Sequence, residues 1–362
     1  MKASVPACVA AFLLAAGAIA WGVLSDAREA RLQASLASIE TAEKTVPYVG
    51  TRVMGGVGPE TAKLKIWSSD GHQRVDFLGF DGVAKPASRP AGPRSPLGGG
   101  LPLFLRPGQD QWKRKIKDPA LAVRNYDIVV TGRDTVAGRA CEVIEIRPHV
   151  EGRPSYRVAA DLENRFPLRF EVLSKGQRVF ETRFSEIDYH PALPEGGWGN
   201  PRRPDWLTVT QEETPAERMA EAAGFTVLRP SSLPKGFELR GSEILRIKAE
   251  VSKELRQTIQ AFLPFPLSKL DARVAHFTYT DGLAAVALVE CSATSELWLH
   301  LKKFLPAGAS EERMAGDSVV ARKFTDRRGS AYLLEVQGTV VLAAGNVSAE
   351  EIESMIRTLE RR

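Results

Sequence analysis

The chain has 362 residues, which is long enough for two domains. Of these residues 43% are hydrophobic and 26% are charged, as in ordinary globular proteins. The formal net charge is +5, and the basic residues are spread along the chain without a dense block interleaved with aromatics. The composition therefore argues against nucleic-acid binding and only mildly favours anionic partners.

The N-terminus carries a segment typical of exported proteins. Residues 5–24 contain no charge and follow Lys2, and Ala18-Ile19-Ala20 and Ser25-Asp26-Ala27 both fit a cleavage site. About 20 apolar residues are also enough to span a bilayer, so a cleaved signal peptide and an uncleaved membrane anchor both stay open. Residues 1–27 are predicted to deliver the rest of the chain to the periplasm, either soluble or tethered to the inner membrane by residues 5–24.

An amphipathic helix and a long β-rich region follow. Leu32, Leu36 and Ile39 recur at helical spacing between Arg28 and Lys44. Apolar and polar residues then alternate in four runs, at 63–66, 74–77, 168–172 and 180–184, and short turns lie at 69–71, 136–138 and 174–176. This alternation predicts an antiparallel sheet with one buried and one solvated face.

Two segments interrupt the β pattern. Residues 85–108 are rich in Pro and Gly, which is typical of either a flap over an apolar groove or a disordered insertion. Residues 191–223 contain Pro201-Arg202-Arg203-Pro204 and are predicted to be the interdomain linker.

A second β-rich unit is expected over residues 224–362. Strands are predicted near 274–279, 284–290, 319–325, 331–337 and 339–344. The chain closes on a helix with a capping box, formed by Ser348 and Glu351. Its apolar face is predicted to pack on the sheet and consists of Ile352, Met355, Ile356 and Leu359.

The sequence lacks the motifs of the common catalytic and metal sites. No two of the five histidines are three or four residues apart, and there is no GxSxG elbow and no phosphate-binding loop. Cys141 and Cys291 lie in strand-like runs far apart in sequence, which favours two buried, unpaired thiols over a disulfide and leaves the disulfide open as the alternative. Two β-rich domains without such a motif favour binding over catalysis, with no cofactor and no metal.

Several segments together resemble one known family. The strongest similarity is the run from Asn125 to Ile146, continued by Tyr156-Arg157-Val158 and Pro167-Leu168-Arg169. Two further segments are Leu233-Pro234-Lys235-Gly236-Phe237 and Tyr279-Thr280-Asp281-Gly282-Leu283. These segments resemble the MucB/RseB family of periplasmic regulators of the sigma-E envelope stress response, and the last two resemble signatures of the family's C-terminal domain. The resemblance spans roughly residues 30 to 360, and the chain departs from the family in the loop at 85–108, an apparent insertion at 245–268 and a long region at 292–312.

The resemblance implies an α+β fold. Residues 28–190 would form a curved antiparallel half-barrel closed by helices, similar to the lipoprotein carriers LolA and LolB, and residues 224–362 a smaller α/β-mixed domain. The implied function is non-enzymatic: binding of the periplasmic part of a membrane-spanning anti-sigma factor, with release by lipid or lipopolysaccharide. A periplasmic lipid or lipoprotein carrier or sensor of the LolA type is the alternative, and an envelope hydrolase with scattered site residues has the least support.

A lipid-binding half-barrel needs apolar side chains on its concave face and cations for headgroups. The apolar groove candidates are Trp67, Phe77, Phe80, Phe104 and Trp112. The candidates for anionic headgroups are Arg74, Lys113, Arg114 and Lys115. Ordinary core packing of the aromatics and a solvated strand face for the basic residues are the competing interpretations.

Overall fold

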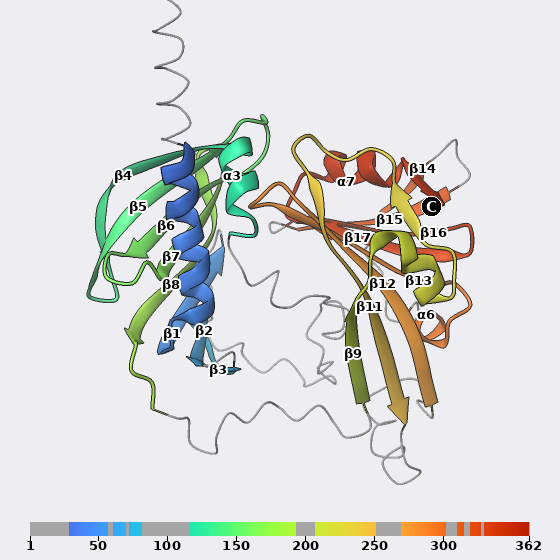
Figure 1. Ribbon diagram of the computed structural model, residues 1–362, viewed down its shortest axis with the longest axis horizontal. Coiled ribbons are helices and arrows are strands. Elements are labelled where there is room, and N and C mark those ends of the chain that lie inside the picture. The colour runs from blue at the N-terminus through green and yellow to red at the C-terminus, as the bar shows by residue number, and fades with distance from the viewer. Residues whose placement is uncertain are drawn as a thin grey trace, which may run out of the picture.

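The computed structural model describes residues 29–56, 61–69, 72–81, 116–192, 207–250, 269–301, 310–314, 319–326 and 329–361. These residues form two domains side by side, each built on an antiparallel sheet (Figure 1). None of the helices within these ranges is long and apolar enough to cross a membrane. The N-terminal segment 1–27, the loop at 85–108 and the greater part of the insertion at 245–268 lie outside the described residues.

The first domain is an eight-stranded sheet in the order β3-β2-β1-β8-β7-β6-β5-β4. Its strands are β1 (Tyr48–Gly56), β2 (Thr61–Ser69), β3 (His72–Asp81), β4 (Tyr126–Val136), β5 (Arg139–Pro148), β6 (Ser155–Asp161), β7 (Pro167–Ser174) and β8 (Gln177–Asp188). A helix over residues 29–45 and the short helix α3 (Pro119–Asn125) cover one face of the sheet (Figure 1). The predicted antiparallel sheet and the turns at 136–138 and 174–176 are confirmed.

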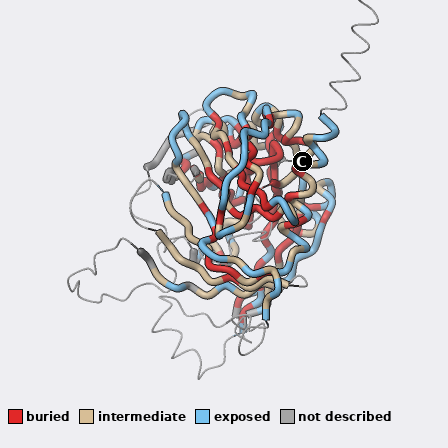
Figure 2. The backbone as a smooth tube through the Cα atoms, turned by 90° about the vertical axis from the view of Figure 1, so that its left-hand side faces the viewer, coloured by how far each residue is buried: buried red, intermediate tan, exposed pale blue. Residues whose placement is uncertain are grey.

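The helix over residues 29–45 packs as its sequence predicts. Leu36 and Ile39 are fully buried, and they join a cluster with Ile144, Tyr156 and other residues of the sheet. Burying an aliphatic side chain of this size contributes about 1.5–3 kcal/mol, so this stripe holds the helix on the sheet. Figure 2 shows the resulting buried segments inside the first domain, with exposed turns around them.

The second domain is also an eight-stranded antiparallel sheet, in the order β14-β15-β16-β17-β13-β12-β11-β9. Its strands are β9 (Leu207–Glu213), β11 (Glu238–Glu250), β12 (Lys269–Thr280), β13 (Ala285–Ser292), β14 (Ser310–Met314), β15 (Val319–Asp326), β16 (Gly329–Val336) and β17 (Thr339–Gly345). A small separate sheet pairs β10 (Leu228–Pro230) with β18 (Leu359–Arg361). The helical elements are η2 (Ala216–Arg218), α4 (Met219–Ala223), α6 (Glu296–Leu301) and α7 (Ala349–Ile356).

Part of the segment expected to be linker belongs to this second sheet. Residues 207–213 form β9, which pairs with β11, and Met219 of α4 is fully buried in the core cluster of the second domain. The Pro/Gly-rich composition that suggested a linker ends before residue 207, and the alternation in Leu207–Glu213 was too short to stand out. Residues 193–206 lie outside the described ranges.

The predicted C-terminal helix is confirmed together with its cap. Ser348 Oγ accepts a hydrogen bond from Glu351 N at 3.2 Å, and Glu351 Oε2 accepts one from Ser348 N at 3.4 Å. Ile352, Met355 and Ile356 are buried in the core. The predicted fourth member of this face, Leu359, lies beyond the end of α7, in β18.

Cys141 and Cys291 are free and buried, as the sequence favoured. Cys141 lies on β5 of the first domain and Cys291 on β13 of the second, so they belong to separate cores. Burial raises the pKa of both thiols, which keeps them protonated at neutral pH.

Glu290 on β13 is an ionisable group inside the second domain. It is 1% exposed, and its Oε2 accepts a hydrogen bond from Leu228 N at 2.9 Å. Its Oε1 has no hydrogen-bond partner among the residues that the structure describes. Burial without a counter-charge raises the pKa of this carboxyl to about 8.

We expect Glu290→Gln to stabilise the protein relative to wild type increasingly as the pH rises. Because the folded-state pKa is above the unfolded value of about 4.5, the folded state binds more protons across this window, and stability falls as the pH rises toward 8. The wild type should lose about 1 kcal/mol per pH unit relative to the variant between these limits. Urea denaturation at pH 5, 6, 7 and 8 measures the difference, and parallel stability curves for the two proteins would refute it.

Candidate functional site

The loop between β12 and β13 reaches from the second domain into the first. The backbone N–H groups of Lys117 and Asp118 donate to Gly282 O at 2.8 and 3.1 Å, just before α3. Leu283 is buried in the core cluster of the first domain, beside Ile116 and Ala122. Figure 1 shows this hairpin pointing at α3. A side chain of the second domain thus completes the core of the first.

The turn of this loop requires glycine. Gly282 has φ +109°, and a Cβ at this position would lie 2.7 Å from Ala122 Cα and 2.8 Å from Asp118 O. Gly236 in the other contacting loop has φ +80°, and a Cβ there would overlap the side-chain amide of Asn125. Both glycines therefore allow close approach of the two domains as well as an unusual backbone conformation.

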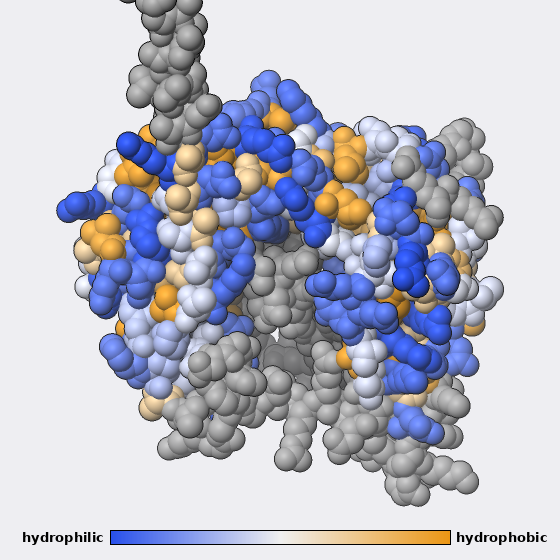
Figure 3. All heavy atoms as spheres, in the orientation of Figure 1, coloured by the Kyte–Doolittle hydropathy of each residue, from blue (hydrophilic) through white to orange (hydrophobic). Residues whose placement is uncertain are grey.

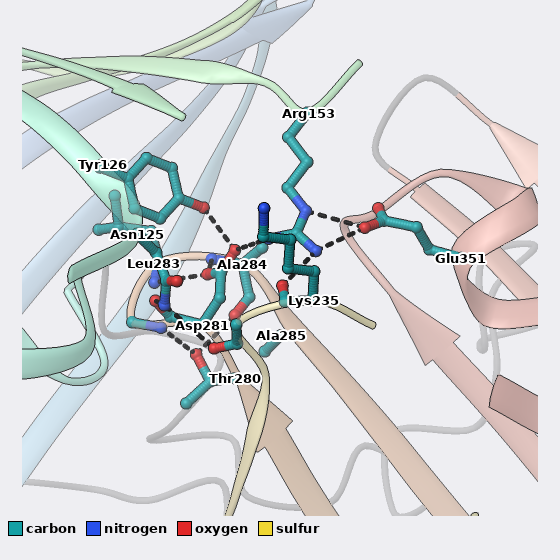
Figure 4. A network of polar contacts seen from close by, with 12 residues as sticks. Asn125, Tyr126, Arg153, Lys235, Thr280, Asp281, Leu283, Ala284, Ala285 and Glu351 are labelled. Atoms are coloured by element: carbon teal, nitrogen blue, oxygen red, sulfur yellow. Dashed lines mark hydrogen bonds and ion pairs between the residues drawn. The ribbon is translucent and has the colours of Figure 1, made fainter. Parts of the chain in front are cut away.

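A buried arginine lies at the centre of the junction (Figure 4). Arg153 comes from the turn between β5 and β6, and its side chain is 2% exposed. Its Nη1 donates to Asp281 Oδ2 at 3.0 Å, and its Nε and Nη2 donate to Glu351 Oε1 at 2.8 and 2.6 Å. Nη2 also donates to Lys235 O at 2.8 Å, and the guanidinium lies over the Phe237 ring, 5.0 Å from its centroid.

The Asp281 carboxylate accepts hydrogen bonds from both domains. Its Oδ1 accepts from Leu283 N and Ala284 N at 3.1 and 2.8 Å, which fixes the loop. Its Oδ2 accepts from Tyr126 OH at 2.8 Å as well as from Arg153. Burial raises the pKa of this carboxyl, and the hydrogen bonds and the arginine act in the opposite direction.

Further polar contacts surround this centre. Asn125 Nδ2 donates to Gly236 O and Asp281 O, both at 3.0 Å. Lys117 Nζ donates to Leu283 O at 2.6 Å, and burial lowers the pKa of this amine to about 8. Two ion pairs lie at the rim, the exposed pair Arg124–Glu238 at 2.8 Å and the half-buried pair Arg240–Asp118 at 2.9 Å. The junction is therefore buried and polar at its centre and charged at its edge.

The sequence had singled out part of this site. Leu233–Phe237 and Tyr279–Leu283 are both contact loops of the junction. Arg153 carries no sequence signal of its own, and Glu351 was predicted only as a helix-capping residue. No local pattern connects these two, because they are 198 positions apart and come from different domains.

Among the residues predicted for a lipid groove, Trp67 is the one whose side chain the structure describes. Trp67 is half-buried, with Arg74 Cζ 5.2 Å and Lys65 Nζ 5.5 Å from its ring centroid. It points away from Ile66, which is buried in the core, so Trp67 lies on the outer face of the sheet. Arg74 is also paired with Asp76 at 2.9 Å.

The other groove and headgroup candidates are only partly placed. Phe77 and Phe80 lie on β3, opposite Leu64 and Ala62 of β2. The remaining candidates lie outside the described residues: Phe104, Trp112, Lys113, Arg114 and Lys115. Within the described ranges no cluster of three or more His, Cys, Asp or Glu side chains is arranged to hold a metal ion.

Comparison with known proteins gives consistent similarities. A sequence profile described as the MucB/RseB N-terminal domain matches residues 31–202. The "Sigma factor AlgU regulatory protein MucB" of Pseudomonas aeruginosa is 27% identical over 225 residues, which are 61% of this chain and 62% of that protein. The alignment thus spans less than two thirds of the relative's length.

Two solved structures cover almost the whole chain. A crystal structure of MucB has a TM-score of 0.52 at 20% identity and covers 92% of this chain and 98% of its own. A crystal structure of MucB in complex with MucA(peri) has a TM-score of 0.47 at 19% identity, covering 91% and 99%. The first of these likenesses supports a shared two-domain fold.

Proposed function

Because the chain belongs to the MucB/RseB family, we propose that it is a non-enzymatic regulator that binds the periplasmic part of a membrane-spanning anti-sigma factor. Its sequence relative MucB is a regulatory protein, and MucB has been crystallised with MucA(peri). Membership of the family is the observation that carries the proposal. The same similarity supports the periplasm as the proposed location of the chain.

The junction supports a binding role more than a catalytic one. Its charged groups are saturated by one another: both oxygens of Asp281 accept two hydrogen bonds, and the Arg153 guanidinium donates four. A general acid, base or nucleophile needs a free position toward a substrate, and these groups have none. Such a network instead fixes how the two domains present their surfaces to a partner.

The visible surface agrees with recognition through shape and charge. On the face in Figure 3 hydrophilic residues predominate and apolar ones are scattered over both domains. A partner segment that spans both domains would depend on their relative position. We infer that the junction keeps this position constant, so that the partner-binding surface is pre-organised.

The proposal is tested by capture of the partner. The full chain, with a C-terminal affinity tag, is expressed in its own host and isolated from detergent-solubilised envelope, and proteins and lipids in the eluate are identified together. We expect recovery of a single-pass membrane protein that carries a cytoplasmic sigma-binding domain. Recovery of lipid or lipoprotein alone would reject the regulatory role and favour a carrier of the LolA type.

We further propose that an acidic lipid is the signal that releases the partner. The support is chemical: the helix-covered face of the first sheet combines apolar side chains with the half-buried Arg52, whose Nε has no hydrogen-bond partner among the described residues. Adding lipopolysaccharide or anionic phospholipid to the captured complex should release the anti-sigma factor, whereas a zwitterionic lipid should not. Equal release by both would show that charge is not the signal.

A further inference from the structure

The strand β4 forms one edge of the first sheet, and its outer side is open. Among the described strands it pairs with β5 alone. Val129 and Val130 are 42% and 51% exposed, and they point to opposite faces of the sheet because neighbouring side chains in a strand alternate. An edge strand with exposed apolar side chains is a template for pairing with another chain.

The first half of β4 turns backbone groups toward this open side. His149 N donates to Asn125 O at 2.9 Å, just before the strand begins. The register of β4 and β5 then continues without a shift from Tyr126 to Val130. Hydrogen-bonded and non-hydrogen-bonded pairs alternate along an antiparallel ladder. The N–H and C=O groups of Ile128 and Val130 therefore point away from β5.

The pairing segment is short. A bulge ends it, because the register shifts between Val130 and Gly132. At the other end Tyr126 N donates to Ala122 O at the end of α3. A specific interface between folded proteins buries about 1,600 Å², far more than the edge Tyr126–Val130 can supply. The edge therefore suits an extended peptide and not a second copy of this chain.

The two faces of the edge define what such a peptide carries. On the core side it would lie beside Tyr126 and Ile128, which belong to a core cluster, and beside the exposed Val130. On the outer side it would lie beside Val129 and beside Asp127, whose side chain is 75% exposed. Cross-strand neighbours prefer apolar partners for apolar residues and opposite charges for carboxylates. The peptide thus has apolar residues at every second position and a lysine or arginine opposite Asp127.

The edge also begins at the junction of the two domains. Tyr126, the first residue of β4, donates its hydroxyl to Asp281 of the second domain at 2.8 Å. Asn125, directly before it, donates to Gly236 O at 3.0 Å. A peptide laid along β4 would therefore reach the contacts that fix the two domains. This position suits the partner proposed above, whose segment spans both domains.

We propose that the open edge Tyr126–Val130 binds an extended segment of the anti-sigma factor, which joins the first sheet as a further strand. The outward backbone groups of Ile128 and Val130 supply hydrogen bonds that do not depend on sequence, and the side chains of Asp127, Val129 and Val130 supply the preference for certain residues. The inference rests on the proposed function and deepens it by naming the surface and the kind of segment that it takes.

Val130→Pro tests the edge. Proline here removes an outward N–H and no hydrogen bond to β5, so the urea midpoint should stay close to that of wild type. The periplasmic segment of the captured anti-sigma factor should bind the full-length variant at least about tenfold more weakly, because a carbonyl of the segment is left buried without a donor. Val130→Thr keeps the N–H and the branched shape and should bind as wild type does. Isothermal titration calorimetry measures all three proteins.

The matched control is Thr135→Pro, on the same strand beyond the bulge. Thr135 N donates to Asp134 Oδ1 at 2.6 Å and not to β5, so this proline also preserves the ladder, and binding should be unchanged. In the wild-type complex hydrogen exchange should slow at the amides of Ile128 and Val130 but not at Thr135. This measurement does not depend on the folding of a variant.

Three outcomes would overturn the inference. If the complex forms but exchange at Ile128 and Val130 is unchanged, or if a folded Val130→Pro binds normally, the segment binds elsewhere and the proposed function stands. If both prolines weaken binding equally, the effect belongs to the strand as a whole and not to its open edge. If wild type captures no anti-sigma factor, the proposed function fails and the inference fails with it.

Discussion

Replacing Arg153 with Met should destabilise the docked arrangement of the two domains by about 3–5 kcal/mol, because it leaves carboxylates buried without their counter-charge. Asp281 is fully buried, and Glu351 is largely so. The variant also leaves Lys235 O without its donor. A Met side chain fills similar volume, so the loss reflects the missing charge and hydrogen bonds more than a cavity.

The control for this variant is Arg147→Met. Arg147 is also on the first domain and is paired with a carboxylate, Glu145, at 2.6 Å, but its side chain is 64% exposed. An exposed ion pair contributes about 0–1 kcal/mol, so this substitution should change stability little. Urea denaturation followed by tryptophan fluorescence measures both. For Arg153→Met we expect two separated transitions in place of one cooperative transition, since the domains no longer stabilise each other.

A double-mutant cycle identifies the contact responsible. Arg153→Met and Glu351→Gln, alone and combined, should give a coupling energy of about 1–3 kcal/mol, because the two side chains share two hydrogen bonds. Strict additivity would mean that Arg153 acts mainly through Asp281 and Lys235. If Arg153→Met unfolds in a single transition with wild-type stability, the junction does not hold the domains together.

The same variant links the junction to the proposed function. If the partner contacts both domains, losing their fixed arrangement adds an ordering cost to binding. The anti-sigma factor captured by wild type should therefore bind Arg153→Met at least about tenfold more weakly, and Arg147→Met normally. Equal capture by both variants would show that one domain alone carries the partner-binding surface.

Much of the fold follows from alternation in the sequence. Strands of both sheets and the helix over residues 29–45 were predicted because each buries one face. Hydrophobic residues then recur every two positions in a strand and about every 3.6 positions in a helix. The capping box of Ser348 and Glu351 was predicted because it is local. Strand order and the membership of β9 in the second sheet depend on contacts between distant segments, which no local pattern contains.

Two residues of the first sheet, Trp67 and Arg52, were not assigned to the correct face from the sequence. Trp67 was chosen as a groove residue because it is large and apolar, but it follows the phase of Lys63 and Lys65, not that of Leu64 and Ile66. Closer use of the same alternation would have placed it on the outer face. Arg52 could not be placed from the sequence. It lies opposite Leu64 and therefore on the same face of the sheet, but this pairing is known only once the register of β1 and β2 is known. An arginine within a strand otherwise reads as a solvated residue.

Gly282 offers the sharpest test of the junction. Gly282→Ala should cost at least about 3 kcal/mol, because φ +109° is disfavoured for L-residues and the added Cβ overlaps the backbone of Asp118 and Ala122. The overlapping atoms belong to the backbone and cannot rotate away as the end of a flexible side chain could. The loop that carries residue 282 must therefore move away from the first domain. Withdrawal removes Leu283 from the first core and breaks the hydrogen bonds of Lys117 and Asp118 to Gly282 O.

Gly338→Ala separates backbone strain from overlap. Gly338 is in the turn between β16 and β17 with φ +75°, and a Cβ there would meet nothing within 4 Å. It should therefore cost only the conformational penalty of about 1 kcal/mol. Hydrogen exchange measured by mass spectrometry distinguishes the two variants, since Gly282→Ala should expose the amides of residues 116–125 while Gly338→Ala leaves them protected. If both glycines cost the same and residues 116–125 stay protected in both, the close approach of Gly282 to α3 does not hold the domains together, and the junction depends on its other contacts, those of Arg153 among them.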